Sequence, residues 1–308
     1  MIVYLDENKW IQIARVWHGK DSSPAVSRIA KLAEAGAFQL PLSAAHYIET
    51  TRTSNAERRQ RLGLVMWQLS RGQTLRSQKS ILVHEAEVAL SHEFPNVQPK
   101  PFELVGTGVT HAFGMEYRAQ LPPVARPIIE RAILTGESVL GMRPPPFSNE
   151  QQRLAFQQHL AGFRGILEKN LTPDRWDDAL HAASLVEVLD PIHEAAALHK
   201  VSPEMLLALG AQRLTRLVDA MPSRRVDIHL HKQVLKNRAY VPKTHDLEDW
   251  GALGVAVVYC DVVVCEKHFK DLVGRDAFRR RRSSCKICWS FYHFSKRQTP
   301  NKSLKLSP

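Results

Sequence analysis

Two short runs of apolar, mainly β-branched residues lie near opposite ends of the chain, and each is closely followed by a carboxylate. Ile2–Leu5 precedes Asp6, and Val262–Val264 is followed by Cys265 and Glu266. Runs of this length and composition predict buried strands of a parallel sheet. Because roughly 250 residues separate the two runs, a sheet that contains both must hold a long insertion between its first and last parts.

Helical patterns accompany both runs. Residues 8–16 and 24–35 predict helices, and a second short strand is expected at 38–42, before a helix that Ser43 can cap and that contains Glu49. Near the other end, a helix capped by Thr244 or Asp246 precedes the run Val262–Val264. This alternation of strands and helices predicts an α/β fold with a parallel sheet flanked by helices.

The long middle of the chain differs in character from both ends. Helical periodicity dominates residues 55–240, with proline-rich loops near 95–108 and 143–149. The expected organisation is therefore an N-terminal part of the α/β core at 1–54, a mostly helical insertion at 55–240, a C-terminal part of the core at 241–278, and a basic, aromatic tail at 279–308.

Composition excludes several classes of protein. Hydrophobic residues make up 44% of the chain, but they form no apolar run long enough to span a bilayer, and the first residues lack the features of a secretory signal. A cytoplasmic protein is expected. Four cysteines, all in the last fifth of the chain, are too few and too late for a disulfide framework. Cys285 and Cys288 form a CxxC pair, which leaves open half of a zinc site or two reduced thiols.

Positive charge is concentrated at the C-terminal end. The net charge is +11, and the residues from Val264 onward contain twelve Lys and Arg against three Asp and Glu. This part of the chain contains a run of four arginines, Arg279, Arg280, Arg281 and Arg282, and aromatic residues follow the run. Basic and aromatic side chains together suit the phosphates and unpaired bases of RNA. The alternative is a solvated tail around a small aromatic plug.

The chemistry of the chain is expected at its carboxylates. Five acids lie at predicted strand ends or in adjacent helices: Asp6, Glu49, Asp246, Asp249 and Glu266. Because ligands of open parallel sheets bind outside the carboxyl ends of the strands, these acids are expected to converge on one edge. Converging carboxylates favour Mg²⁺ or Mn²⁺, which can activate water and stabilise charge on a phosphodiester. Each acid alone has a structural alternative, such as a helix cap or a solvated surface position.

Three segments resemble PIN and PIN-like nuclease domains: IVYLDENKW, FQLPLSAAHYIET and DLEDWGALGVAVVYCDVVVCEKHF. Matched residue by residue, the acids of that family fall on Asp6, Glu49, Asp249 and Glu266, with Asp246 able to replace or assist Asp249. The resemblance implies a Mg²⁺- or Mn²⁺-dependent endoribonuclease, as in many prokaryotic toxins and RNA-processing enzymes. The chain departs from the family at Cys265, where Thr or Ser is usual, at Glu266, where Asp is usual, and in its long insertion.

Two hypotheses of different class follow. The first is a metal-dependent ribonuclease whose insertion shapes the substrate groove and whose tail contacts RNA. The second is a non-catalytic RNA-binding module on a degenerate PIN scaffold, which the glutamate at the fourth acid position favours. A flap-cleaving DNA nuclease ranks lower, since those enzymes carry a larger acid cluster. The RNA target, an inhibitory partner protein and assembly into a homo-oligomer are not determined by the sequence.

Asp261 precedes its strand, at the wrong edge, and is expected to be structural.

Overall fold

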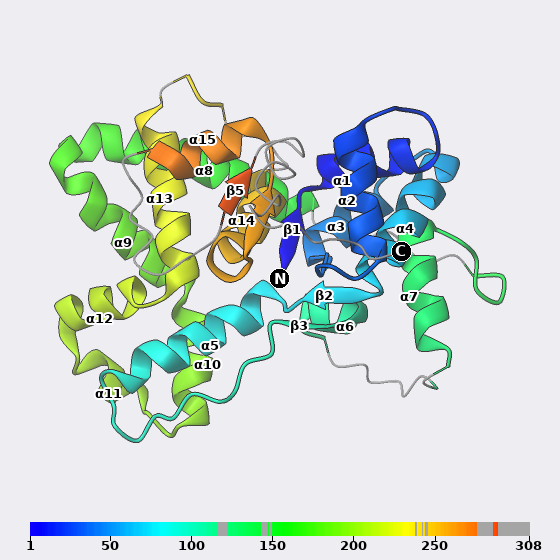
Figure 1. The fold of residues 1–308 in the computed structure, drawn as a ribbon. Coiled ribbons are helices and arrows are strands. Elements are labelled where there is room, and N and C mark those ends of the chain that lie inside the picture. The colour runs from blue at the N-terminus through cyan, green and yellow to red at the C-terminus, as the bar shows by residue number, and fades with distance from the viewer. Residues whose placement is uncertain are drawn as a thin grey trace, which may run out of the picture.

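A computed structural model of the chain shows helices on both sides of a small sheet (Figure 1). It describes residues 1–115, 122, 124–142, 147, 150–237, 239–241, 243, 246–275 and 286–288. Several residues singled out in the sequence lie outside these ranges: Thr244, Arg279, Arg280, Arg281, Arg282 and Cys285.

The two apolar runs from opposite ends of the chain are neighbours in one parallel sheet. Its order is β1 (Val3–Leu5), β4 (Val262–Val264) and β5 (Lys286–Cys288). Leu5, Val264 and Cys288 are aligned, so the three strands end at the same edge. The strand expected at 38–42 is reduced to isolated bridges, in which Gln39 pairs with Ile2 and Leu42 with Thr74. The α/β prediction is confirmed at this level.

Strand residues alternate between two hydrophobic cores, as the two-residue period of a strand requires. Val3, Leu5, Val262, Val264 and Cys288 face a core built with the helices α1 (Glu7–Trp17), α2 (Pro24–Glu34), α4 (Ala56–Ser70) and α7 (Arg126–Thr135). Tyr4, Val263 and Ile287 face a second core built mainly with α13 (Pro222–Lys236), α14 (Asp246–Tyr259) and α15 (Lys267–Gly274). Helices therefore cover both faces of the sheet, which explains why every residue of β1 and β4 is buried.

Five helices belong to the segments of the chain that contain the sheet strands. They are α1 (Glu7–Trp17), α2 (Pro24–Glu34), α3 (Ala44–Thr51), α14 (Asp246–Tyr259) and α15 (Lys267–Gly274). The bounds of α1, α2, α3 and α14 agree with the helices expected from periodicity to within a few residues, whereas α15 was not predicted. Their starts matter most for function, because α1 and α15 begin directly after the ends of β1 and β4.

The rest of the chain is mainly helical. It contains α4 (Ala56–Ser70), α5 (Gln78–Ser91), α6 (Gly108–Phe113), α7 (Arg126–Thr135), α8 (Glu150–Asn170), the 3₁₀ turn η1 (Pro173–Arg175), α9 (Trp176–Glu187), α10 (Leu189–Leu198), α11 (Pro203–Leu207), α12 (Gly210–Asp219) and α13 (Pro222–Lys236). Periodicity did not predict β2 (Gln73–Leu75) and β3 (Val105–Thr107), which form an antiparallel pair. None of the helices among the described residues is long and apolar enough to cross a membrane.

Candidate functional site

Asp6 lies where the sequence predicted, immediately after β1 at the edge where the strands end. Its backbone N–H donates to the Val264 carbonyl oxygen at 3.0 Å, which ties it to β4. Its carboxylate Oδ1 accepts the Glu7 N–H at 2.8 Å and so caps α1. The capping role considered from sequence is therefore real, and it fixes the direction of the side chain rather than excluding a site there.

Glu266 reaches the same edge from β4. It occupies the N-cap position of α15, and its Oε1 accepts a hydrogen bond from Asn8 Nδ2 at 2.5 Å. That bond connects the end of β4 to α1. The side chain is exposed, yet its negative charge is one of the causes that raise the pKa of Asp6.

Glu49 is brought to this edge by a histidine that sequence reasoning did not single out. His46 Nε2 contacts the Leu5 carbonyl oxygen at 2.7 Å, and the Ser43 N–H donates to His46 Nδ1 at 2.8 Å. Burial lowers the pKa of His46 to about 4, so the ring is neutral and its Nε2–H donates to Leu5. The ring thus fastens the start of α3 to the residue before Asp6. A His three residues after a capping Ser was the available signal.

The two predicted aspartates of α14 have different surroundings. Asp246 is buried, and its Oδ2 accepts hydrogen bonds from Tyr240 Oη at 2.6 Å and from the Lys243 N–H at 2.7 Å. Asp249 is only partly buried. Burial and the charges of Asp6, Asp246 and Glu266 raise the pKa of Asp249 to about 8.

These electrostatic effects connect all five predicted acids. Burial and then Glu266 raise the pKa of Asp6 to about 6, although Lys9 opposes the shift. Burial, Glu7, Asp249 and Asp6 raise the pKa of Glu49 well above its usual range. Such mutual repulsion requires the carboxylates to lie close together in a partly dry environment. Acids from both ends of the chain therefore influence one another electrostatically at this edge.

Two further residues belong to this arrangement. Burial raises the pKa of both Glu7 and Glu49, and the hydrogen bond between the two carboxyl groups adds to the shift at Glu49 and opposes it at Glu7. Tyr4 is buried on β1; burial raises its pKa, and the charges of Asp6, Glu49 and Asp249 add to that shift. Sequence reasoning missed both, although Glu7 directly follows Asp6.

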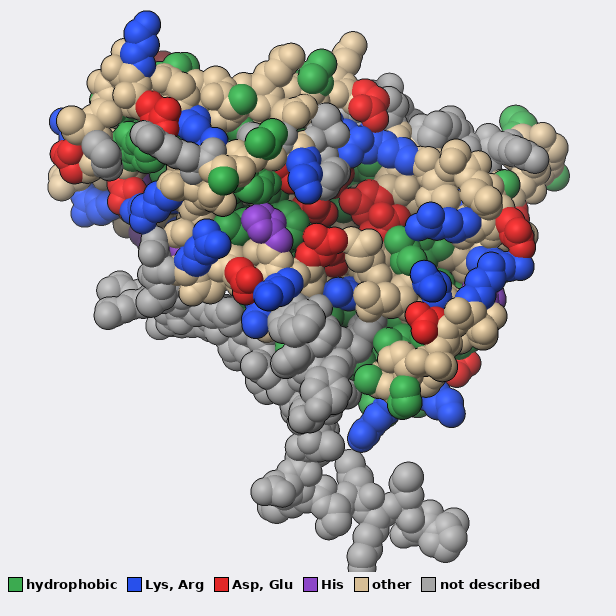
Figure 2. All heavy atoms as spheres, turned by 90° about the horizontal axis from the view of Figure 1, so that it is seen from above, with side chains coloured by type: hydrophobic (Ala, Val, Ile, Leu, Met, Phe, Trp, Pro, Cys, Tyr) green, Lys and Arg blue, Asp and Glu red, His purple; other side chains and the backbone are tan. Residues whose placement is uncertain are grey.

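The face of the molecule toward which the sheet strands run is acidic at its middle. Figure 2 views the molecule from the end toward which β1 runs in Figure 1, and it shows acidic side chains gathered there with Lys and Arg side chains around them. The opposite edge behaves differently. The carboxylate of Asp261 accepts the Ile2 N–H at 2.7 Å, which confirms its structural role.

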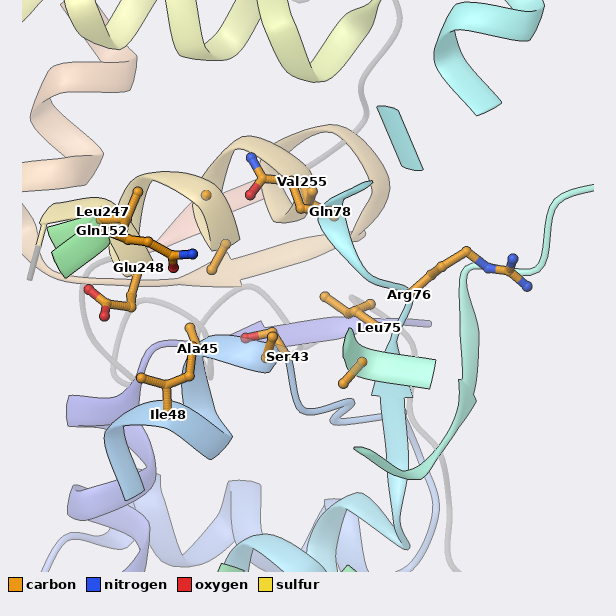
Figure 3. Close-up of a pocket in the computed structure, with 14 residues that line it drawn as sticks. Ser43, Ala45, Ile48, Leu75, Arg76, Gln78, Gln152, Leu247, Glu248 and Val255 are labelled. Atoms are coloured by element: carbon orange, nitrogen blue, oxygen red, sulfur yellow. The ribbon is translucent and has the colours of Figure 1, made fainter. Parts of the chain in front are cut away.

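A hollow of about 230 Å³ lies between α3 and α14, and none of the five predicted acids is among its lining residues (Figure 3). Its lining is mainly apolar, with Ser43, Gln78 and Gln152 among the polar residues. Glu248 also lines it, but its buried carboxylate pairs with Arg52 Nη1 and Arg153 Nε, each at 3.2 Å. Two arginines thus compensate the charge of Glu248.

Among the residues that the structure describes, no three His, Cys, Asp or Glu side chains form a ready ligand set for a metal ion. The donor chemistry nevertheless suits a hard divalent cation, because every member of the cluster is a carboxylate. Burial and then repulsion raise the pKa values of Asp6 and Asp249, and a cation would relieve the repulsive part of these shifts.

Comparison with known proteins does not place the chain in a family. The sequence matches no protein-family model and no curated protein, and no solved structure matches it. The resemblance to PIN-like nucleases therefore stays a prediction.

Proposed function

We propose that this chain is a Mg²⁺- or Mn²⁺-dependent endoribonuclease with a PIN-like α/β core. The observation that supports it is that burial and mutual repulsion together raise the pKa values of Asp6 and Asp249 at the edge where β1 and β4 end. Isolated surface acids do not repel one another in this way, and strongly perturbed groups gather at functional sites. Function cannot be read from the fold alone, so the proposal depends on these side chains.

Asp6, Glu49 and Asp249 would hold the cation, with Glu266 at the exposed rim. Asp246 would mainly hold its neighbours in place rather than bind the cation, because its Oδ2 already accepts hydrogen bonds from Tyr240 and from the Lys243 backbone. Such an ion supplies activated water and stabilises negative charge on the phosphodiester.

The chain's own residues keep the carboxylates in place without that ion. The neutral ring of His46 holds α3 against the end of β1. The hydrogen bond between Glu49 and Glu7 limits their repulsion. A cation that binds at neutral pH must therefore displace protons from Asp249 and Glu49, which ties its affinity to pH.

The direct test is cleavage of a labelled single-stranded RNA by the full chain with Mg²⁺ or Mn²⁺ and with EDTA. Asp6→Asn and Asp249→Asn should each lower the cleavage rate more than about 100-fold. This loss exceeds the one typical of residues that only hydrogen-bond to a metal ligand. Asp190→Asn is the matched control, because Asp190 is exposed on α10. The proposal fails if the two site variants are folded and cleave RNA as fast as Asp190→Asn.

The non-catalytic RNA-binding scaffold is the second candidate. It is favoured by the lack of a ready ligand set among the described residues and by the exposure of Glu266. It predicts RNA binding that persists in EDTA, with no cleavage under any divalent ion. Association with an inhibitory protein, as for a toxin, is a further prediction of the family resemblance, and co-purification would test it.

A further inference from the structure

A second, larger hollow of about 580 Å³ lies between α1 and the start of α4. Ile11, Ala14 and Leu62 contribute apolar side chains to its lining. Its basic residues come from two segments: Arg15, His18 and Lys20 at the end of α1, and Arg58 and Arg61 in the first turns of α4. We call this hollow the basic groove.

The basic groove has a clear excess of positive charge. Four Lys and Arg line it against one acid, Glu57. Arg61 pairs with Glu57, and Arg15 Nε lies 3.7 Å from Asp21, but these are surface pairs with much exposed side chain. Such pairs contribute little and exchange readily for a stronger anionic partner. Lys20 and Arg58 are exposed as well.

The two helices that build the basic groove, α1 and α4, also connect it to the carboxylate site formed by Asp6, Glu49 and Asp249. α1 begins directly after Asp6, and α4 follows the helix that contains Glu49. Arg15 lies nine positions after Asp6 in the sequence, which corresponds to about 14 Å at the helical rise. At the near end, Arg58 lies close enough to Glu7 to stabilise its negative charge.

We propose that the basic groove binds the sugar–phosphate backbone of a single-stranded RNA whose scissile bond lies at the carboxylates. This inference rests on the proposed function and names how its substrate is held. Positive charge along a groove that leads to an acidic centre suits a polyanion, which the acids alone would repel. Among the described residues, the lining contains cations and no Phe, Tyr or Trp. Backbone contact rather than base stacking is therefore expected, with little sequence preference.

The experiment measures binding without cleavage. Fluorescence anisotropy of a labelled 12-nucleotide single-stranded RNA is recorded with the full chain in EDTA, from low to moderate salt. The groove variant is Arg15→Gln, Lys20→Gln and Arg58→Gln combined. Each lost phosphate contact weakens binding about 5-fold at 0.1 M salt, so the dissociation constant should rise about 100-fold, and the slope of log affinity against log salt should fall by about 2.

The control variant removes the same charge elsewhere. Lys169→Gln, Lys200→Gln and Arg216→Gln change exposed residues on or near α8, α10 and α12, and binding should stay within about 2-fold of the parent. Equal unfolding free energies for both triple variants show that the groove variant is folded. Equal RNA affinities for both would overturn the inference. So would competition by polyglutamate as effective as that by unlabelled RNA, which would indicate an acidic protein partner instead.

Failure of the basic groove and failure of the proposed function give different results. If the basic groove is right but the chain is not a nuclease, the groove variant loses binding while the parent cleaves nothing under any divalent ion. If the chain is a nuclease but the basic groove is wrong, the groove variant binds and cleaves like the control variant, whereas Asp249→Asn does not cleave.

Discussion

Replacing Asp249 by Asn should stabilise the ion-free protein at alkaline pH. The folded structure raises the pKa of this carboxyl from 3.8 to about 8, through burial and the charges of Asp6, Asp246 and Glu266. A group whose pKa is raised on folding contributes stability that is full below its unfolded pKa and is lost as the pH rises through its folded pKa. The parent should therefore lose stability between about pH 4 and pH 8 in EDTA, and Asp249→Asn should lose less.

The magnitude follows from proton linkage. One extra proton bound by the folded state lowers the unfolding free energy by about 1.4 kcal/mol per pH unit. Between pH 5.5 and pH 8 the ceiling for Asp249 is thus about 3 kcal/mol. Asp249 is partly exposed, and solvent screens part of the repulsion, so the expected difference between parent and variant is about 1 to 2 kcal/mol.

Urea unfolding at a series of pH values from 5.5 to 8 measures this difference. In EDTA, the unfolding free energies of the parent and Asp249→Asn should diverge as the pH rises, while Asp190→Asn follows the parent. Addition of Mg²⁺ should stabilise the parent at pH 8 more than the variant, because cation binding to the folded state adds to stability. Parallel pH profiles for all three proteins would refute the electrostatic reasoning for the carboxylate cluster.

Two further substitutions test the packing of α4 against α7 and the attachment of α3 to β1. Gly63→Ala would place a methyl group 2.7 Å from the Leu134 backbone and should lower the unfolding free energy by about 2 kcal/mol, measured by thermal or urea unfolding. The control is Gly162→Ala, which lies in open space on α8 and should be neutral or stabilise the protein by up to about 1 kcal/mol. Equal effects of the two substitutions would contradict the close approach of α4 and α7. His46→Ala removes the hydrogen bond to the Leu5 carbonyl oxygen and should cost about 3 kcal/mol. It should also weaken the stabilisation by Mg²⁺, and an unchanged response to Mg²⁺ would show that His46 does not position Glu49.

The local parts of the fold were readable from sequence. Strands β1 and β4 were predicted because β-branched runs buried on both faces have a distinctive composition. The helices α1, α2, α3 and α14 were predicted because apolar residues recur at the helical period and because Ser43, and Thr244 or Asp246, mark helix starts, whereas α15 was not predicted. Asp6 and Glu266 could be assigned to one edge of the sheet, since parallel strands place their carboxyl ends together.

Other features were decided by tertiary structure, because they depend on contacts between residues far apart in the chain. The β2–β3 pair and β5 are three-residue strands, too short for a periodic signal and defined only by their partners. The contact of His46 with Leu5, the use of Asp246 by Tyr240, and the basic groove between α1 and α4 likewise arise from packing. Sequence thus determined which carboxylates approach the edge of the sheet, whereas packing determined how each is held, because hydrogen bonds and burial are set by non-local neighbours.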